Sequence, residues 1–139
     1  MNLKKAKKIV EKVTGKVLDL EFTFPMVNGH LEAKSSITMN GFDDDIYCQF
    51  RFYEDGLVSY CFTFDKLEES ADVLGLINTF NKNVPFFKAY IEDGFLRIDH
   101  VCYEMSEKNL EEYTKGIFRQ MINETTKEHL RPLTELTHD

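Results

Sequence analysis

The sequence predicts an α+β domain, an antiparallel β-sheet of five to six strands with three helices packed chiefly on one face. Apolar residues recur with a helical period up to residue 14, then every second residue, and the helical period returns at 70–81 and after 106. Three dipeptides suited to tight hairpin turns each separate two strand-like segments: Asn28-Gly29, Asp55-Gly56 and Asp93-Gly94. The predicted order is therefore α-ββββ-α-ββ-α.

The N-terminal helix is expected over residues 2–14, where an apolar stripe has helical spacing and Gly15 suits a C-terminal cap. Residues 17–64 follow as a meander of four strands. Leu18 to Phe24 alternates apolar and acidic or hydroxyl side chains, as a half-buried strand does. A two-residue turn at Asn28-Gly29 makes the numbers of paired residues add to 57, so Phe24 should lie opposite Ala33.

The second hairpin should join Ile46–Glu54 to Leu57–Phe64 through Asp55-Gly56, with paired numbers adding to 111. This register puts Cys48, Phe50, Phe52 and Cys61 on one face. Its other face carries mostly large aromatic side chains: Tyr47, Tyr53, Val58, Tyr60, Phe62 and Phe64. Helices on one side of a sheet cover only one face, so this second set is the candidate protein-interaction face. The alternative is that the N-terminal helix crosses it.

The remaining elements form a unit over residues 70–135. A helix over 70–81 begins at Ser70 as N-cap, and a hairpin pairs Phe87–Glu92 with Phe95–Val101. The last helix begins after Ser106, and Pro132 should end or bend it. No linker or repeat divides the chain, so residues 1–139 are expected to form one domain.

The stretch from Val73 to Leu96, VLGLINTFNKNVPFFKAYIEDGFL, resembles the core of the YbjN-like bacterial proteins. Asn78, Asn81, the Asp93-Gly94 turn and the ending Leu130-Arg131-Pro132-Leu133 carry the resemblance. It covers about half the chain, residues 70–135. It implies the fold of type III secretion chaperones and a non-enzymatic, often dimeric module that binds other proteins.

Net charge, hydropathy and cysteine content limit the kinds of partner and the cellular compartment that we expect. The net charge of −7 disfavours nucleic acid, and no apolar run approaches the ~20 residues of a membrane span. Three widely spaced cysteines (Cys48, Cys61 and Cys102) form neither a disulfide framework nor a metal motif, which predicts reduced thiols in the cytoplasm. Cys48 and Cys61 should share a face without bonding.

No motif indicates a cofactor, a metal or a catalytic site. The three acidic residues Asp43-Asp44-Asp45 lack the spacing of a calcium loop and are expected to form a solvated loop. His100 is expected to be a hydrogen-bonded histidine at the edge of the core.

The function that we expect is a non-enzymatic intracellular protein-binding or chaperone-like module, a homodimer. One alternative is a small cytosolic enzyme with a loop-borne site that uses Asp43, Asp44 and His30. Another is a binder of anionic surfaces through the N-terminal helix, since residues 1–16 hold six lysines and one glutamate: Lys4, Lys5, Lys7, Lys8, Lys12, Lys16 and Glu11.

Overall fold

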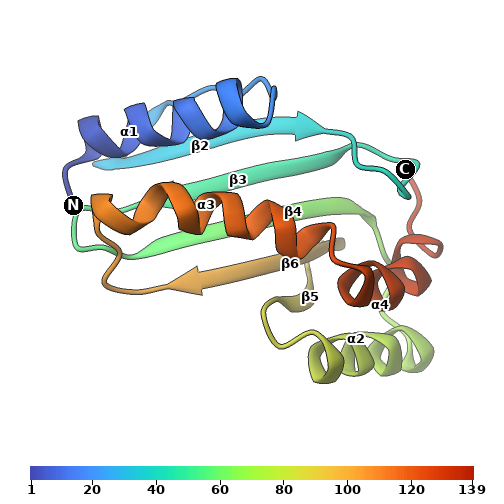
Figure 1. Cartoon of the computed structure of the whole chain (residues 1–139). Helices are drawn as coiled ribbons and strands as arrows, with labels where there is room; N and C mark the ends of the chain where they lie inside the picture. The colour runs from blue at the N-terminus through green and yellow to red at the C-terminus, as the bar shows by residue number, and fades with distance from the viewer.

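The computed structural model, which describes residues 1–139, contains one six-stranded antiparallel sheet in the order β1-β2-β3-β4-β6-β5 (Figure 1). The strands are β1 (Met26–Val27), β2 (His30–Ile37), β3 (Ile46–Phe52), β4 (Val58–Lys66), β5 (Lys88–Glu92) and β6 (Phe95–Cys102). The predicted α+β class and antiparallel sheet are confirmed.

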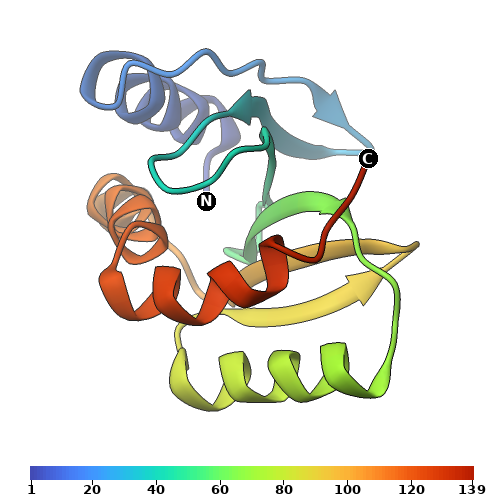
Figure 2. The ribbon, with the colours of Figure 1, turned by 90° about the vertical axis from the view of Figure 1, so that its right-hand side faces the viewer.

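Of the four helices, three cover one face of the sheet and one, Ala71–Asn83, lies along the edge strand β5; Figure 2 shows no helix over the other face. They are α1 (Leu3–Glu11), which continues into a π-helical turn η1 (Lys12–Val17), α2 (Ala71–Asn83), α3 (Glu107–Met121) and α4 (Glu124–Thr134). The helix α1 lies beside α3, on the same side of the sheet, so it does not cross the second face. None of the four helices has the length and apolar character that a bilayer span requires.

The first and third hairpins have the predicted registers. Val27 pairs with His30, and Glu92 pairs with Phe95, each across a two-residue turn. Asn28 and Gly29 have φ of 49° and 82°, and Asp93 and Gly94 have φ of 54° and 81°. Positive φ at both central residues is the condition for the type I′ turn, whose twist matches that of the strands.

The second hairpin differs from the prediction by one residue. Cys48 pairs with Phe62 and Phe50 with Tyr60, so the numbers add to 110 and not to 111. The loop has three residues, because Tyr53 N–H donates to the Leu57 carbonyl across it. Only Gly56 has positive φ, +93°, as in a type I turn followed by a left-handed glycine.

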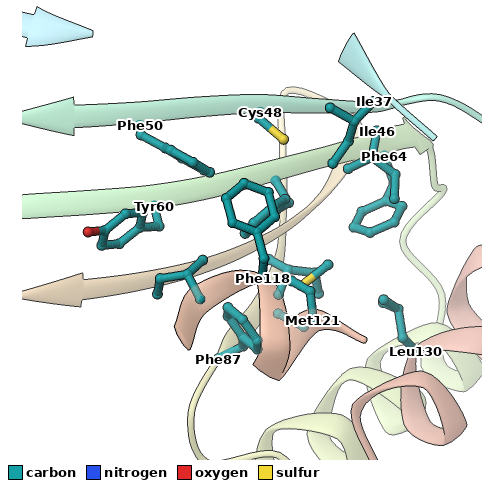
Figure 3. Close-up of a cluster of buried hydrophobic side chains, with 14 of the residues drawn as sticks. Ile37, Ile46, Cys48, Phe50, Tyr60, Phe64, Phe87, Phe118, Met121 and Leu130 are labelled. Carbon is teal, nitrogen blue, oxygen red and sulfur yellow. The ribbon is translucent and has the colours of Figure 1, made fainter. Parts of the chain in front are cut away.

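A shift of one residue turns every side chain of β4 to the other side of the sheet. Val58, Tyr60, Phe62 and Phe64 therefore point toward the helices and are buried, and assigning them to an exposed interaction face was wrong. Figure 3 shows Tyr60 and Phe64 in one cluster with Phe118 and Met121 of α3. Tyr60 Oη lies 2.9 Å from Thr114 Oγ1, and this hydrogen bond satisfies the buried hydroxyl.

Three further predictions were wrong in detail. Leu18–Phe24 is not a regular strand: only Thr23 bridges Lys34, and the apolar side chains pack on the core from an irregular segment that Pro25 ends. The first helix does not stop at Gly15, which lies inside η1. The last helix is two helices, because Asn123 accepts from Thr125 N–H and caps α4, while Pro132 lies within α4.

The outer edge of β5 is closed by a side chain of α2. Asn81 Oδ1 accepts from Ala89 N–H at 2.7 Å, and Asn81 Nδ2 donates to the Ala89 carbonyl at 3.1 Å. The amide thus occupies the position of a neighbouring strand, which blocks the edge to further pairing. This contact gives Asn81, one of the residues that carry the family resemblance, a structural role.

Candidate protein-interaction surface

The helix-free side of the sheet is termed the open face. The registers align its side chains in rows across four or five strands. These rows are Glu32–Arg51–Ser59–Val101, Lys34–Gln49–Cys61–Asp99–Lys88 and Ser36–Tyr47–Thr63–Arg97–Tyr90. The open face therefore presents polar, charged and aromatic groups, whereas the covered face is apolar.

Glu32 is the centre of a polar network on the β2 side of the open face. Its carboxylate accepts from His30 Nε2 at 3.1 Å, Lys34 Nζ at 3.1 Å, and Arg51 Nε and Gln49 Nε2 at 3.4 Å each. The Glu32 side chain is only 5% exposed, although no helix covers it. A buried carboxylate needs such partners, and this one receives four donors.

These donors control the ionisation of Glu32. Burial by itself raises the pKa of a carboxyl group, but the hydrogen bonds from His30, Lys34 and Gln49 and the charge of Lys34 outweigh it. The pKa of Glu32 falls from 4.5 to about 2. Glu32 is thus ionised over the physiological pH range and holds the side chains of Lys34 and Arg51 in place.

Large side chains on the open face remain accessible. Tyr47 is 40% exposed and Val101 is 42% exposed. The ring of Tyr53 stacks on His30, with centroids 4.6 Å apart. Tyrosine and arginine are the residues that protein interfaces favour, since both contribute large contact areas with polar ends.

The β6 side of the open face carries a second polar group. Tyr90 Oη donates to Asp99 Oδ2 at 2.9 Å, and Arg97 Nη1 lies 3.4 Å from Glu92 Oε1. Arg97 Nε is buried and has no acceptor within the chain. A hollow of about 340 Å³ adjoins it, lined also by Tyr47 and by residues such as Thr63, Asp45 and Asp65.

Two of the six residues predicted for the interaction face, Tyr47 and Tyr53, lie on the open face. The other four belong to the core. Sequence reasoning missed Glu32, Arg97 and Asp99. A signal was present within β4 itself, where Ser59, Thr63 and Asp65 alternate with the apolar residues and so mark the solvent side.

The cysteines are free, and the predicted shared face of Cys48 and Cys61 is wrong. Cys48 points into the core and Cys61 into the open face, so the two thiols lie on opposite sides of the sheet. Burial raises the pKa of both thiols, and it raises the pKa of Cys102 to about 11. Thiols held protonated in this way are poor nucleophiles.

His100 lies at the edge of the core, as predicted. Its Nδ1–H donates to the Phe86 carbonyl at 2.7 Å, so its Nε2 accepts from the Tyr113 hydroxyl at 2.6 Å. The Phe86 ring stacks on the imidazole at 4.2 Å. One ring nitrogen thus holds β6 to the segment before β5 and the other holds it to α3, which is a structural role.

The residues proposed for a loop-borne enzyme site are far apart. His30 begins β2, whereas Asp43 and Asp44 lie before β3, at the opposite end of the strands, which are about 20 Å long. Asp44 instead lies near Asp65 and Asp139, with ligand oxygens within 4.8 Å of one another. Burial and repulsion from Asp44 raise the pKa of Asp65.

This carboxylate group is the set of side chains best placed to hold a cation. Asp44 and Asp139 are exposed, and Arg131 of α4 lines the same cleft with Asp44 and Asp65. The guanidinium brings a positive charge of the chain itself to these acids.

The lysines of the N-terminal helix lie mainly at its exposed surface. Lys12 Nζ pairs with Glu111 Oε1 of α3 at 2.7 Å, and Lys7 pairs with Glu11 at 3.8 Å. The buried side of α1 consists of Ala6 and Val10. The stripe that predicted this helix therefore packs it on the core.

Comparison with protein-family models, with curated proteins and with solved structures finds no match. The likeness of residues 70–135 to the YbjN-like proteins therefore stays a prediction from the sequence.

Proposed function

We propose that the chain is a non-enzymatic, intracellular protein-binding module that acts as a homodimer through the open face. The observation that carries this proposal is a sheet face that no helix covers and that presents accessible tyrosine, valine and arginine side chains. A sheet face of this composition suits a second protein surface better than bulk water.

The order of the open face supports the same function. Glu32 holds Arg51 and Lys34, and the His30 ring supports Tyr53. Groups held in position before binding lose less conformational entropy when a partner arrives, so the same contacts give a higher affinity. The reduced thiols and the resemblance to chaperone-like proteins agree with an intracellular binding role.

The size of the open face sets the affinity to expect. Five strands spaced about 4.8 Å apart and about 20–25 Å long give a face on the order of 500 Å² per copy. Two copies then bury about 1,000 Å², near the lower limit of specific interfaces. We therefore expect a dissociation constant in the micromolar range.

Sedimentation velocity of the whole chain from about 1 to 200 µM tests the proposal, since a dissociation constant in the micromolar range lies within it. The wild type should become dimeric within this range, and the variant Tyr47→Ser/Val101→Ser should stay monomeric with an unchanged circular dichroism spectrum. The matched control Leu74→Ser/Ile122→Ser removes exposed apolar side chains from α2 and from the end of α3. A dimer that survives the first pair of substitutions, or is lost with the second, would refute the role of the open face.

A further inference from the structure

One row of residues divides the open face into two halves, and the side chains of one half are chemically complementary to those of the other. The registers place Ser35, Cys48, Phe62, Ile98 and Ala89 side by side, one from each of the five long strands. Residues at equal distances before and after this row on the same strand form a symmetric pair. If two open faces meet across a two-fold axis along the row, each residue faces the other member of its pair in the second copy.

The pairs defined in this way match in charge. Arg51 of β3 and Asp45, the residue just before β3, are each three residues from Cys48. On β6, Asp99 and Arg97 are each one residue from Ile98. Each of these two pairs therefore sets a guanidinium group opposite a carboxylate.

The pairs farther from the centre of the sheet match as well. Val101 and Phe95 are each three residues from Ile98, which pairs apolar with apolar. On β5, Lys88 and Tyr90 flank Ala89, which sets an ammonium group opposite an aromatic ring. On β2, Lys34 and Ser36 flank Ser35, which sets an ammonium group opposite a hydroxyl group.

We infer that a second copy of this chain binds the open face across this axis, with Arg51 opposite Asp45 and Arg97 opposite Asp99 of the second copy. The inference rests on the proposed function and names its partner and its geometry. Sheets packed face to face lie about 10 Å apart with strands within about 30° of alignment, a gap that arginine side chains span.

Two features of the single chain support this arrangement. The terminal nitrogens of Arg97 make only long contacts within the chain, 3.4 Å to Glu92 Oε1 and 3.9 Å to Asp93 Oδ2, so Asp99 of the second copy can offer them a closer carboxylate. Arg51 uses only Nε toward Glu32, which leaves its two terminal nitrogens free for a bidentate contact with a carboxylate. Asp45 is exposed and borders the same hollow as Arg97, so its carboxylate is available on this face.

Opposite charge reversals on two separately purified chains test the arrangement. Arg51→Asp alone sets two carboxylates against each other across the axis, and Asp45→Arg alone sets two guanidinium groups together; like charges across an interface oppose association. Each variant should dimerise at least about tenfold more weakly than the wild type. An equimolar mixture of the two should form a heterodimer of near wild-type affinity, because every reversed pair is then of opposite charge.

The control is Asp43→Arg, which makes the same change of charge in the same loop, at a residue that lines the cleft beside Arg131. It should leave dimerisation unchanged. Should Arg51→Asp lose the native circular dichroism spectrum, Asp45→Arg alone must still weaken the dimer about tenfold relative to Asp43→Arg.

The outcomes separate this inference from the proposed function. A wild-type dimer that Tyr47→Ser/Val101→Ser abolishes, without recovery in the mixture, would leave the proposed function standing and overturn the axis. A wild-type chain that is monomeric at the highest concentration, about 200 µM, would overturn the second copy as the occupant.

Discussion

Replacing Phe62 with alanine tests the register of β3 and β4, on which the description of the open face depends. The Phe62 side chain is wholly buried. Its ring centroid lies 5.5 Å from that of Phe50, 6.1 Å from Phe118 and 6.2 Å from Phe87. Three rings from β3, α3 and the segment before β5 enclose the site, so it has little freedom to collapse after truncation.

The expected loss of stability follows from this enclosure. Truncating a core phenylalanine typically costs about 3–5 kcal/mol, through the lost transfer free energy and the cavity that remains. We expect a value of about 4 kcal/mol, a large share of the ~5–15 kcal/mol that stabilises a small domain. At a urea dependence of about 2 kcal/mol per M, the unfolding midpoint should fall by roughly 2 M.

Urea unfolding followed by circular dichroism makes the measurement, with Thr63→Ala as its control. Thr63 is the next residue along β4 and points into the open face beside Tyr47 and Arg97. Its truncation should cost less than about 1 kcal/mol. If Thr63→Ala proved the more destabilising of the two, Thr63 and not Phe62 would point into the core. The pairing of Cys48 with Phe62 would then be wrong.

Gly56→Ala should destabilise the domain by more than about 2 kcal/mol in the same assay, because φ is +93° and the added Cβ would lie 3.0 Å from the Met105 backbone nitrogen. Gly29→Ala is the control: its φ is +82° but no atom lies near the added Cβ, so it should cost about half as much. Glu32 has a folded-state pKa of about 2 against 4.5 in the unfolded chain, so its ionisation stabilises the fold above pH 4.5, by up to about 3 kcal/mol, and this stabilisation is lost as the pH falls from 4.5 to 2. The stability difference between wild type and Glu32→Gln, measured by urea unfolding at pH values of about 7, 4 and 2.5, should therefore shrink with decreasing pH; a constant difference would contradict it. Asn81→Ala leaves the outward N–H of Ala89 without its partner, so hydrogen exchange at that amide should accelerate, at a cost of about 1–2 kcal/mol; unchanged exchange would mean that Asn81 does not close the edge.

Local chemistry was sufficient where a turn determines a register by itself. Asn28-Gly29 and Asp93-Gly94 both adopt positive φ at two successive residues, and their strands pair as predicted. The N-cap at Ser70 is equally local, since its Oγ accepts from Val73 N–H three residues on. Such features depend on neighbouring residues only and are therefore visible in the sequence.

The same kind of dipeptide adopts a different turn at Asp55-Gly56, and the tertiary structure shows a contact that accompanies it. The Gly56 carbonyl accepts from Met105 N–H at 2.9 Å, and the loop packs closely against that backbone. This contact joins residues that are far apart in the chain, so a rule based on neighbouring residues cannot predict it. The register of β3 and β4 consequently differs by one residue from the prediction, and four predicted surface residues belong to the core.

The sequence by itself determined the α+β class, the antiparallel sheet, two of three hairpin registers and the helix–hairpin unit beginning at Ser70, because hydrophobic period and turn residues act over short distances. Only the tertiary structure decided which face of β4 is buried, that α1 joins the other helices, and that Glu32 meets Arg51. The pairing of β2 with β3 across a long loop brings those two side chains together. Their meeting depends on the assembled sheet, since a long loop, unlike a two-residue turn, does not impose a register on its strands.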